Sequence, residues 1–94
     1  MYKDLEQVLS DRVITRGGLS LYRYDDAVLL IALCNNHNIQ VLGIDAFSLI
    51  DGYTRPMMEH SIDLSNVETI KRNETAYNFL VSKRNLGLVF EVVY

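Results

Sequence analysis

The chain has 94 residues, of which 49% are hydrophobic and 22% are charged. These values are close to those of ordinary globular proteins, so they exclude extensive disorder and predict one domain, residues 1–94, with a modest core. The formal net charge of −3 is mild, and its distribution along the chain is more informative than its sum.

The acidic residues are concentrated in the middle third of the chain. The segment from Gln40 to Glu68 carries five acidic residues and one basic residue. Residues 1–39 carry five acidic and four basic residues, and residues 69–94 carry two acidic and four basic residues. The middle third therefore disfavours binding to the phosphates of a nucleic acid and favours a cationic partner.

The single cysteine and the apolar runs indicate a cytoplasmic protein. Cys34 cannot form an internal disulfide, and its place in an apolar run predicts a small buried hydrophobe in a reducing compartment. The charged N-terminal residues lack the apolar core of a signal peptide. The longest apolar run, from Ala27 to Cys34, is far shorter than the ~20 residues that span a bilayer, so no membrane association is expected.

The first half of the chain predicts a short helix, two short strands and a long helix. Apolar residues recur at helical spacing from Tyr2 to about Leu9. Residues 13–15 are β-branched, and residues 19–22 alternate after a Gly-Gly turn, so both are predicted to be short strands. Asp25 and Asp26 are expected to cap a helix that extends to Asn36 and, being apolar all round, is buried on more than one side. His37 and Asn38 end this helix, with Asn38 in the left-handed conformation.

A buried strand, Val41 to Phe47, carries one carboxylate, Asp45. This strand is predicted to extend from residue 39 to 48 and to turn at Asp51-Gly52 into a second strand over residues 56–63. A two-residue loop would place Asp45 opposite Met58 with His60 on the diagonal, and a wider register would place Asp45 directly opposite His60. Both registers predict a structural Asp45–His60 pair that joins the two strands.

The last third predicts an amphipathic helix over residues 74–84, with Asn73 as its cap, and a final strand over residues 88–94. The resulting fold class is α+β. A small mixed or antiparallel sheet of three to four strands is expected, with two to three helices packed mainly on one face. The order of the elements after the first helix is that of the split βαβ units of ferredoxin-like folds.

Asp45, His60 and Glu91 are the only residues that suggest a catalytic or ligand-binding cleft. A carboxylate that orients an imidazole is half of an acid–base site, but no nucleophile stands in a recognisable motif. Two histidines 23 residues apart do not form a metal motif. Neither a metal nor another cofactor is expected, and the chain is not expected to be an enzyme.

Three short motifs resemble those of small bacterial immunity proteins, the antidotes encoded beside the toxins of polymorphic and contact-dependent inhibition systems. They are Gly43-Ile44-Asp45-Ala46-Phe47, Glu59-His60-Ser61-Ile62-Asp63 and Leu88-Val89-Phe90-Glu91-Val92. The resemblance covers residues 24–94 and implies an α+β cytoplasmic protein that binds and neutralises one cognate toxin domain. The resemblance assigns no toxin-contacting residue.

The contact residues are therefore predicted from charge and side-chain type alone. The acidic segment would engage a basic toxin surface, such as the active site of a nuclease, through acidic residues and a tyrosine. These residues are Asp51, Tyr53, Glu59, Asp63 and Glu68. Two alternatives stay open: a ligand-binding domain or enzyme that uses Asp45, His60 and Glu91, and a self-assembling module whose terminal strand pairs with its copy. The expected oligomeric state is a monomer or a weak homodimer.

Overall fold

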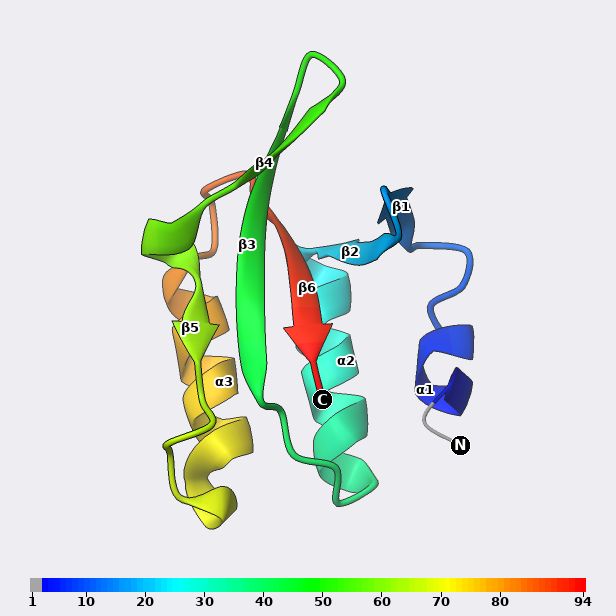
Figure 1. The fold of residues 1–94 in the computed structure, drawn as a ribbon. Helices are drawn as coiled ribbons and strands as arrows, with labels where there is room; N and C mark the ends of the chain where they lie inside the picture. Colours follow the sequence, from blue (N-terminus) through cyan, green and yellow to red (C-terminus); the bar gives the residue numbers. More distant parts are fainter. Residues whose placement is uncertain (1–2) are drawn as a thin grey trace.

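Six strands, three α-helices and two 3₁₀ turns make up the fold in this computed structural model, which describes residues 3–94, with side chains from Leu5 onward. Figure 1 shows how these elements are arranged, with colours that follow the chain from blue at the N-terminus to red at the C-terminus. Their bounds are α1 Lys3–Gln7, β1 Ile14–Arg16, β2 Leu19–Arg23, α2 Tyr24–Asn36, β3 Gly43–Ile50, β4 Tyr53–Pro56, η1 Met58–His60, β5 Ile62–Asp63, η2 Thr69–Lys71, α3 Arg72–Ser82 and β6 Val89–Val93. Tyr2, the first residue of the predicted N-terminal helix, lies outside the described residues.

The sheet is antiparallel throughout, with the strand order β1-β2-β6-β3-β4, and β5 also pairs with β3. The α+β class is confirmed, but the sheet has more strands than the three to four predicted. The predicted ferredoxin-like fold is wrong in the order of the strands within the sheet. The chain order β2-α2-β3-β4-α3-β6 matches that motif, yet the central pair of strands is β6 and β3. A ferredoxin-like sheet instead places the first and third of its four strands at the centre.

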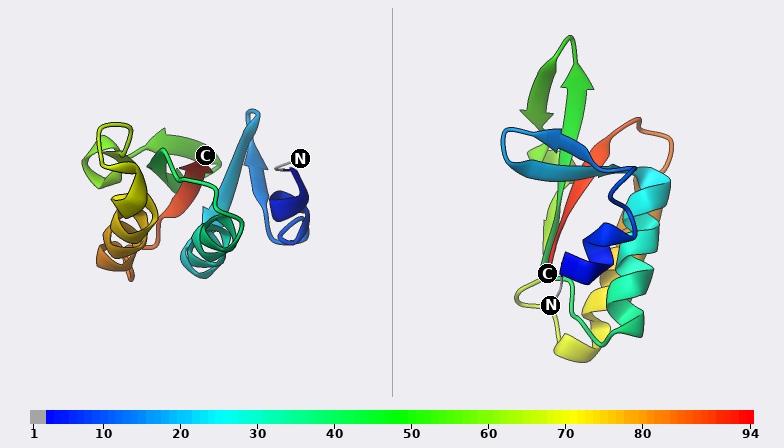
Figure 2. Two further views of the ribbon diagram at one scale, coloured as in Figure 1. Left: turned by 90° about the horizontal axis from the view of Figure 1, so that it is seen from below. Right: turned by 90° about the vertical axis from the view of Figure 1, so that its right-hand side faces the viewer.

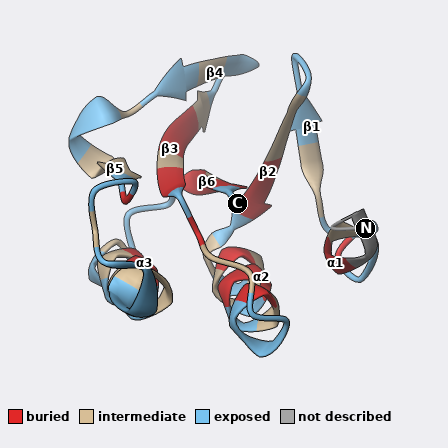
Figure 3. Cartoon of the chain, turned by 60° about the horizontal axis from the view of Figure 1, so that its bottom comes forward, coloured by how far each residue is buried: buried red, intermediate tan, exposed pale blue. Residues whose placement is uncertain are grey.

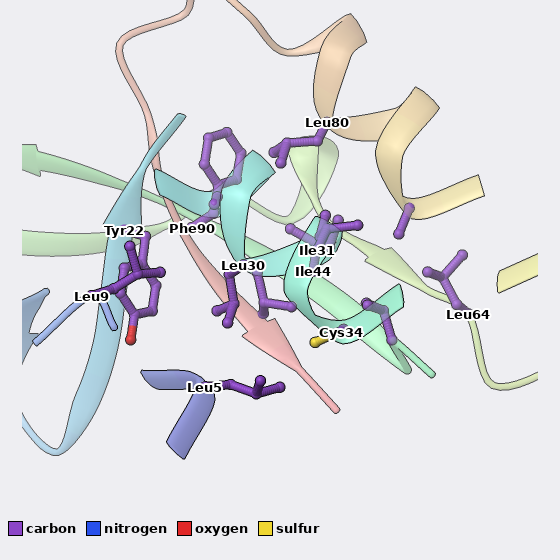
Figure 4. Packing of buried hydrophobic residues seen from close by; sticks show 14 of the residues in the cluster. Leu5, Leu9, Tyr22, Leu30, Ile31, Cys34, Ile44, Leu64, Leu80 and Phe90 are labelled. Carbon is purple, nitrogen blue, oxygen red and sulfur yellow. The ribbon is translucent and has the colours of Figure 1, made fainter. Parts of the chain in front are cut away.

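The helices lie on one face of the sheet and enclose the main core (Figure 2). Alternate residues of the strands point toward the helices, because side chains along a strand change face with a period of two. Figure 4 shows how Ile44 and Phe90 from the central strands meet Leu30 of α2 and Leu80 of α3, all of which have no exposed surface. The sole cysteine, Cys34, is also buried in this cluster, as predicted, and burial raises the pKa of its thiol to about 11.

One side of α2 remains open to solvent. Leu30, Ile31 and Cys34 face the core, whereas Leu29 and Ala32 are exposed. The prediction that this helix is buried on more than one side is confirmed in part, because the sheet, α1 and α3 all pack against it and only its outer side is exposed. Its C-terminal end is as predicted, with His37 at the C-cap and a left-handed Asn38.

The other face of the sheet is concave. Figure 3 shows the β1–β2 hairpin and the β3–β4 hairpin rising on either side of the central strands, away from the helices. Leu21, Phe47 and Val89 form a second buried cluster between these hairpins. The curl thus gives the sheet a small apolar core on the face that has no helix over it.

The predicted strand over residues 56–63 is broken in the middle. Residues 53–56 and 62–63 form β4 and β5, but Met58, Glu59 and His60 form the 3₁₀ turn η1. The side chain of Ser61 compensates for the break, since its Oγ accepts a hydrogen bond from the N–H of Ala46 at 2.9 Å and donates to the carbonyl of Met57 at 2.9 Å. A serine hydroxyl therefore occupies a place in the ladder of β3 where a backbone carbonyl would otherwise stand.

The C-terminal strand lies inside the sheet. β6 pairs with β2 on one side and with β3 on the other. The alternative in which this strand pairs with its copy would have to use the β2 side of β6 beyond Phe90, because β3 pairs with the whole of the other side and β2 pairs with Val89 and Phe90.

Candidate functional site

The β3–β4 hairpin forms an arm that extends beyond the rest of the fold (Figure 1). Its outer part, Ser48–Ile50 against Tyr53–Arg55, pairs only within the hairpin, since the ladder to β6 ends at Phe47. Asp51 and Gly52 form the tip, with φ values of 51° and 81°. Positive φ at both positions is the type I′ turn that an Asp-Gly pair favours, so the predicted turn and the Ile50–Tyr53 register are confirmed.

Large apolar side chains are exposed on and beside this arm. The exposed fractions are 57% for Ile50, 77% for Tyr53 and 79% for Met58 in η1. Ile50 and Tyr53 are cross-strand partners and point to the face that carries the helices. They are exposed because the arm extends past the helices that cover this face lower down. An apolar cluster in such a position is typical of a protein-binding surface.

The predicted acidic contact residues all lie along one edge of the molecule. Asp51 is at the tip of the arm, Glu59 in η1, Asp63 in β5 and Glu68 just before η2, and all four are exposed. We call these four residues, together with Tyr53, the acidic edge. Figure 1 shows its elements following one another from the tip of the hairpin down the outer side of β3.

Two residues of the acidic edge have local partners. Asp63 Oδ1 accepts a hydrogen bond from the N–H of Ser65 at 2.9 Å, and this bond holds the pKa of Asp63 below its ordinary value. Glu68 lies 3.9 Å from the Nζ of Lys71. The upper part of the edge, Asp51, Tyr53 and Glu59, is thus the part best placed to contact a partner together with Ile50 and Met58.

The predicted pair of Asp45 and His60 is replaced by two other contacts. The three-residue shift of register between β4 and β5 places Asp63, and not His60, opposite Gly43. His60 Nδ1 lies 3.2 Å from the Nζ of Lys83, next to α3. Asp45 instead faces Glu91 of β6. The predicted Asp45–His60 pair depended on a continuous strand over residues 56–63 with side chains on alternate faces, and η1 interrupts that strand.

Asp45 and Glu91 form a carboxyl pair on the concave face. Burial raises the pKa of Glu91, and the neighbouring Asp45 raises it further by its charge and by a hydrogen bond between the two carboxyl groups. Glu91 therefore keeps its proton to a higher pH than an exposed glutamate does.

The alternative of a ligand-binding or catalytic cleft required Asp45, His60 and Glu91 to lie together, and the structure separates them. The two carboxyl groups share the concave face, while the imidazole is engaged with Lys83. Among the residues that the structure describes, no three histidine, cysteine or acidic side chains gather as metal ligands. Ser61 places a hydroxyl group in the ladder on the other side of β3, but its Oγ is already engaged with the N–H of Ala46 and the carbonyl of Met57.

Replacing Glu91 by Gln is expected to raise the free energy of unfolding by about 0.5 to 1 kcal/mol at neutral pH, since directly opposed like charges on neighbouring strands cost roughly this much. A carboxyl group whose pKa is raised by folding destabilises the fold when it ionises. The advantage of the variant should therefore be largest at neutral pH and shrink as the pH falls through the raised pKa of Glu91.

Urea unfolding of both proteins from about pH 7 to about pH 4 measures this effect. Glu59→Gln is the matched control, because Glu59 is exposed in η1 and should give no such difference. An advantage for Glu91→Gln that does not change with pH would show that the two carboxyl groups do not interact.

Ile50 was not among the contact residues predicted from the sequence, and Met58 was predicted only as the residue opposite Asp45 in one register. The signal for Ile50 was its position directly before the turn, where a strand leaves the sheet. Met58 gave no comparable signal, because its exposure depends on the 3₁₀ turn, which the alternating pattern of the segment conceals.

Comparison with family models, with curated proteins and with solved structures gave no match. Within residues 3–94, every helix is too short or too polar to cross a membrane.

Proposed function

We propose that this chain is a non-enzymatic binding protein that neutralises a cognate toxin domain, as the resemblance to bacterial immunity proteins implies. The observation that carries the proposal is a set of exposed apolar residues, Ile50 and Tyr53 at the tip of the β3–β4 arm and Met58 in η1 at its base, with Asp51 and Glu59 next to them in the sequence. Tyrosine and methionine are enriched at the centres of protein interfaces, and charged residues surround them.

The proposed partner presents a basic surface. Asp51 and Glu59 would steer it toward the arm, and Asp63 and Glu68 would extend the same potential along the acidic edge. The catalytic groove of a nuclease has the required charge, because it must hold an anionic substrate. In this proposal the protein acts in the cytoplasm as a monomer or weak homodimer and binds neither a nucleic acid nor a membrane.

Replacing Tyr53 by Ala is expected to weaken binding of the toxin domain about tenfold or more, because a central exposed tyrosine contributes on this scale when an interface buries it. The toxin domain is expected at the C-terminus of a large secreted protein encoded immediately upstream. Isothermal titration with that domain measures the affinity, and growth of cells that express it measures neutralisation.

The matched control is Tyr77→Ala, which removes an exposed tyrosine from α3. It should leave the affinity unchanged. Asp51→Lys and Glu68→Lys together should weaken binding and flatten its dependence on salt. Unchanged affinity in Tyr53→Ala, or an unchanged salt dependence in the double variant, would contradict this surface. A failure of the chain to restore growth would contradict the function itself.

A further inference from the structure

A pocket of about 470 Å³ opens at one end of the fold, where β2 passes into α2 and where the chain returns from α3 to β6. Its volume lies within the range of small-molecule sites. Three cationic side chains line it, Arg23, Lys83 and Arg84, and Asp25 is its one acidic residue. The basic excess of residues 69–94, which the acidic edge does not use, thus contributes two of the three cations.

The cations of this pocket have no carboxylate partner. The ion pairs among the described side chains are Arg12 with Asp26 and Lys71 with Glu68, so neither Arg23 nor Arg84 takes part in one. Lys83 Nζ lies 3.2 Å from His60 Nδ1 and 5.2 Å above the centre of the Phe79 ring. Both contacts leave the charge of the ammonium group uncompensated.

The backbone adds to the positive potential in the pocket. Arg23, the N-cap residue of the 13-residue helix α2, makes no side-chain hydrogen bond to the first turn. The N–H groups of that turn lie at the positive end of the helix dipole, in the same turn as Asp25 and Asp26. Tyr24, half-buried, and Leu88 line the same pocket and give it an apolar wall.

We propose that this pocket binds a small phosphate monoester. The phosphate would lie among Arg23, Lys83 and Arg84, which supply guanidinium and ammonium donors suited to its oxygens. The organic part would lie against Tyr24 and Leu88. The pocket uses none of the residues of the acidic edge, so this proposal is independent of the proposed toxin binding.

Titration of the full chain with inorganic phosphate, AMP and adenosine, followed by amide chemical shifts, tests the proposal. Saturable shifts are expected at Tyr24, Asp25, Asn85 and Gly87 with phosphate and with AMP. AMP should bind more tightly than phosphate, and adenosine should not bind. Equal affinity for phosphate and AMP would overturn the assignment to an ester, and the absence of saturable shifts would overturn the site.

Variants separate the pocket from the general effect of charge. Arg23→Gln and Arg84→Gln should each weaken AMP binding about fivefold or more, whereas Asp25→Asn should strengthen it. Arg16→Gln is the matched control, since Arg16 is an exposed arginine of β1 outside the pocket. Equal weakening by all three arginine variants would show only a nonspecific attraction and would overturn the proposal. Melting temperatures of the variants verify that each is folded.

Discussion

Replacing Glu6 by Ala is expected to lower the free energy of unfolding by about 3 kcal/mol. Glu6 Oε1 accepts a hydrogen bond from the hydroxyl of Tyr22 at 3.2 Å, and Oε2 accepts one from the hydroxyl of Tyr94 at 2.8 Å. Hydrogen bonds to charged groups contribute roughly 1.5 to 3 kcal/mol each. One side chain of α1 therefore holds both β2 and the C-terminal residue to the helical side of the sheet.

The environment of Tyr22 explains why this loss should be large. The residue is only 2% exposed, so its hydroxyl group would lose its acceptor in a largely buried position. Burial, together with the nearby Glu6, raises the pKa of Tyr22 to about 12.

Urea unfolding of Glu6→Ala, of two further single variants and of one double variant measures the contribution of Glu6. Gln7→Ala is the control for helix propensity, because Gln7 is exposed in the same helix, and it should change the stability little. Tyr22→Phe removes one hydrogen bond and should cost less than Glu6→Ala. The double variant should cost less than the sum of the two, since both changes remove the same bond. Equal stability of Glu6→Ala and Gln7→Ala would contradict this role.

Replacing Asn73 by Ala is also expected to lower the free energy of unfolding by about 3 kcal/mol. The change leaves backbone groups of the connection between α2 and β3 without hydrogen-bond partners. Asn73 Oδ1 accepts a hydrogen bond from the N–H of Val41 at 2.8 Å, and Nδ2 donates to the carbonyl of Ile39 at 2.9 Å and to Oδ1 of Asn35 at 3.3 Å. Val41 is fully buried, so water cannot replace the lost acceptor.

Thermal unfolding of Asn73→Ala should show a fall in melting temperature of more than ten degrees for a domain of this size. Asn78→Ala is the matched control, because Asn78 is exposed on the same helix and gains the same helix propensity. Asn73→Asp should be intermediate, since it keeps the acceptor for Val41 and loses both donated bonds. If Asn73→Ala and Asn78→Ala have the same melting temperature, the side chain does not hold the connection.

The elements with strong local signals could be predicted from the sequence. The apolar run after Asp26 gave the helix α2, and the pattern after Asn73 gave α3, each within two residues of its ends. The Asp-Gly pair fixed the hairpin turn and its register because few backbone conformations suit that pair. Asn73 itself was predicted to be a helix cap. It lies instead in the first turn of the helix and binds another segment, which a local pattern cannot reveal.

The errors arose where contacts between distant parts of the chain decide the structure. Residues 56–63 alternate like a strand, yet Ser61 allows η1 to interrupt it by replacing a ladder hydrogen bond. Glu6 and Tyr94 are 88 residues apart, so no local spacing could show their contact. The opposition of Asp45 and Glu91 likewise required the strand order, which places the last strand beside β3.

The 3₁₀ turn η1 interrupts the edge of the sheet formed by β4 and β5, and this affects whether copies of the protein can associate through that edge. Pro56 has no N–H group, and the 3₁₀ turn that follows carries the backbone out of the extended conformation. Along this side of the sheet, unpaired backbone groups are therefore confined to two short stretches, β4 and the two-residue β5. Neither reaches the roughly six residues of a fibril-forming segment, so this side of the sheet offers no long edge to which a second copy could add a strand.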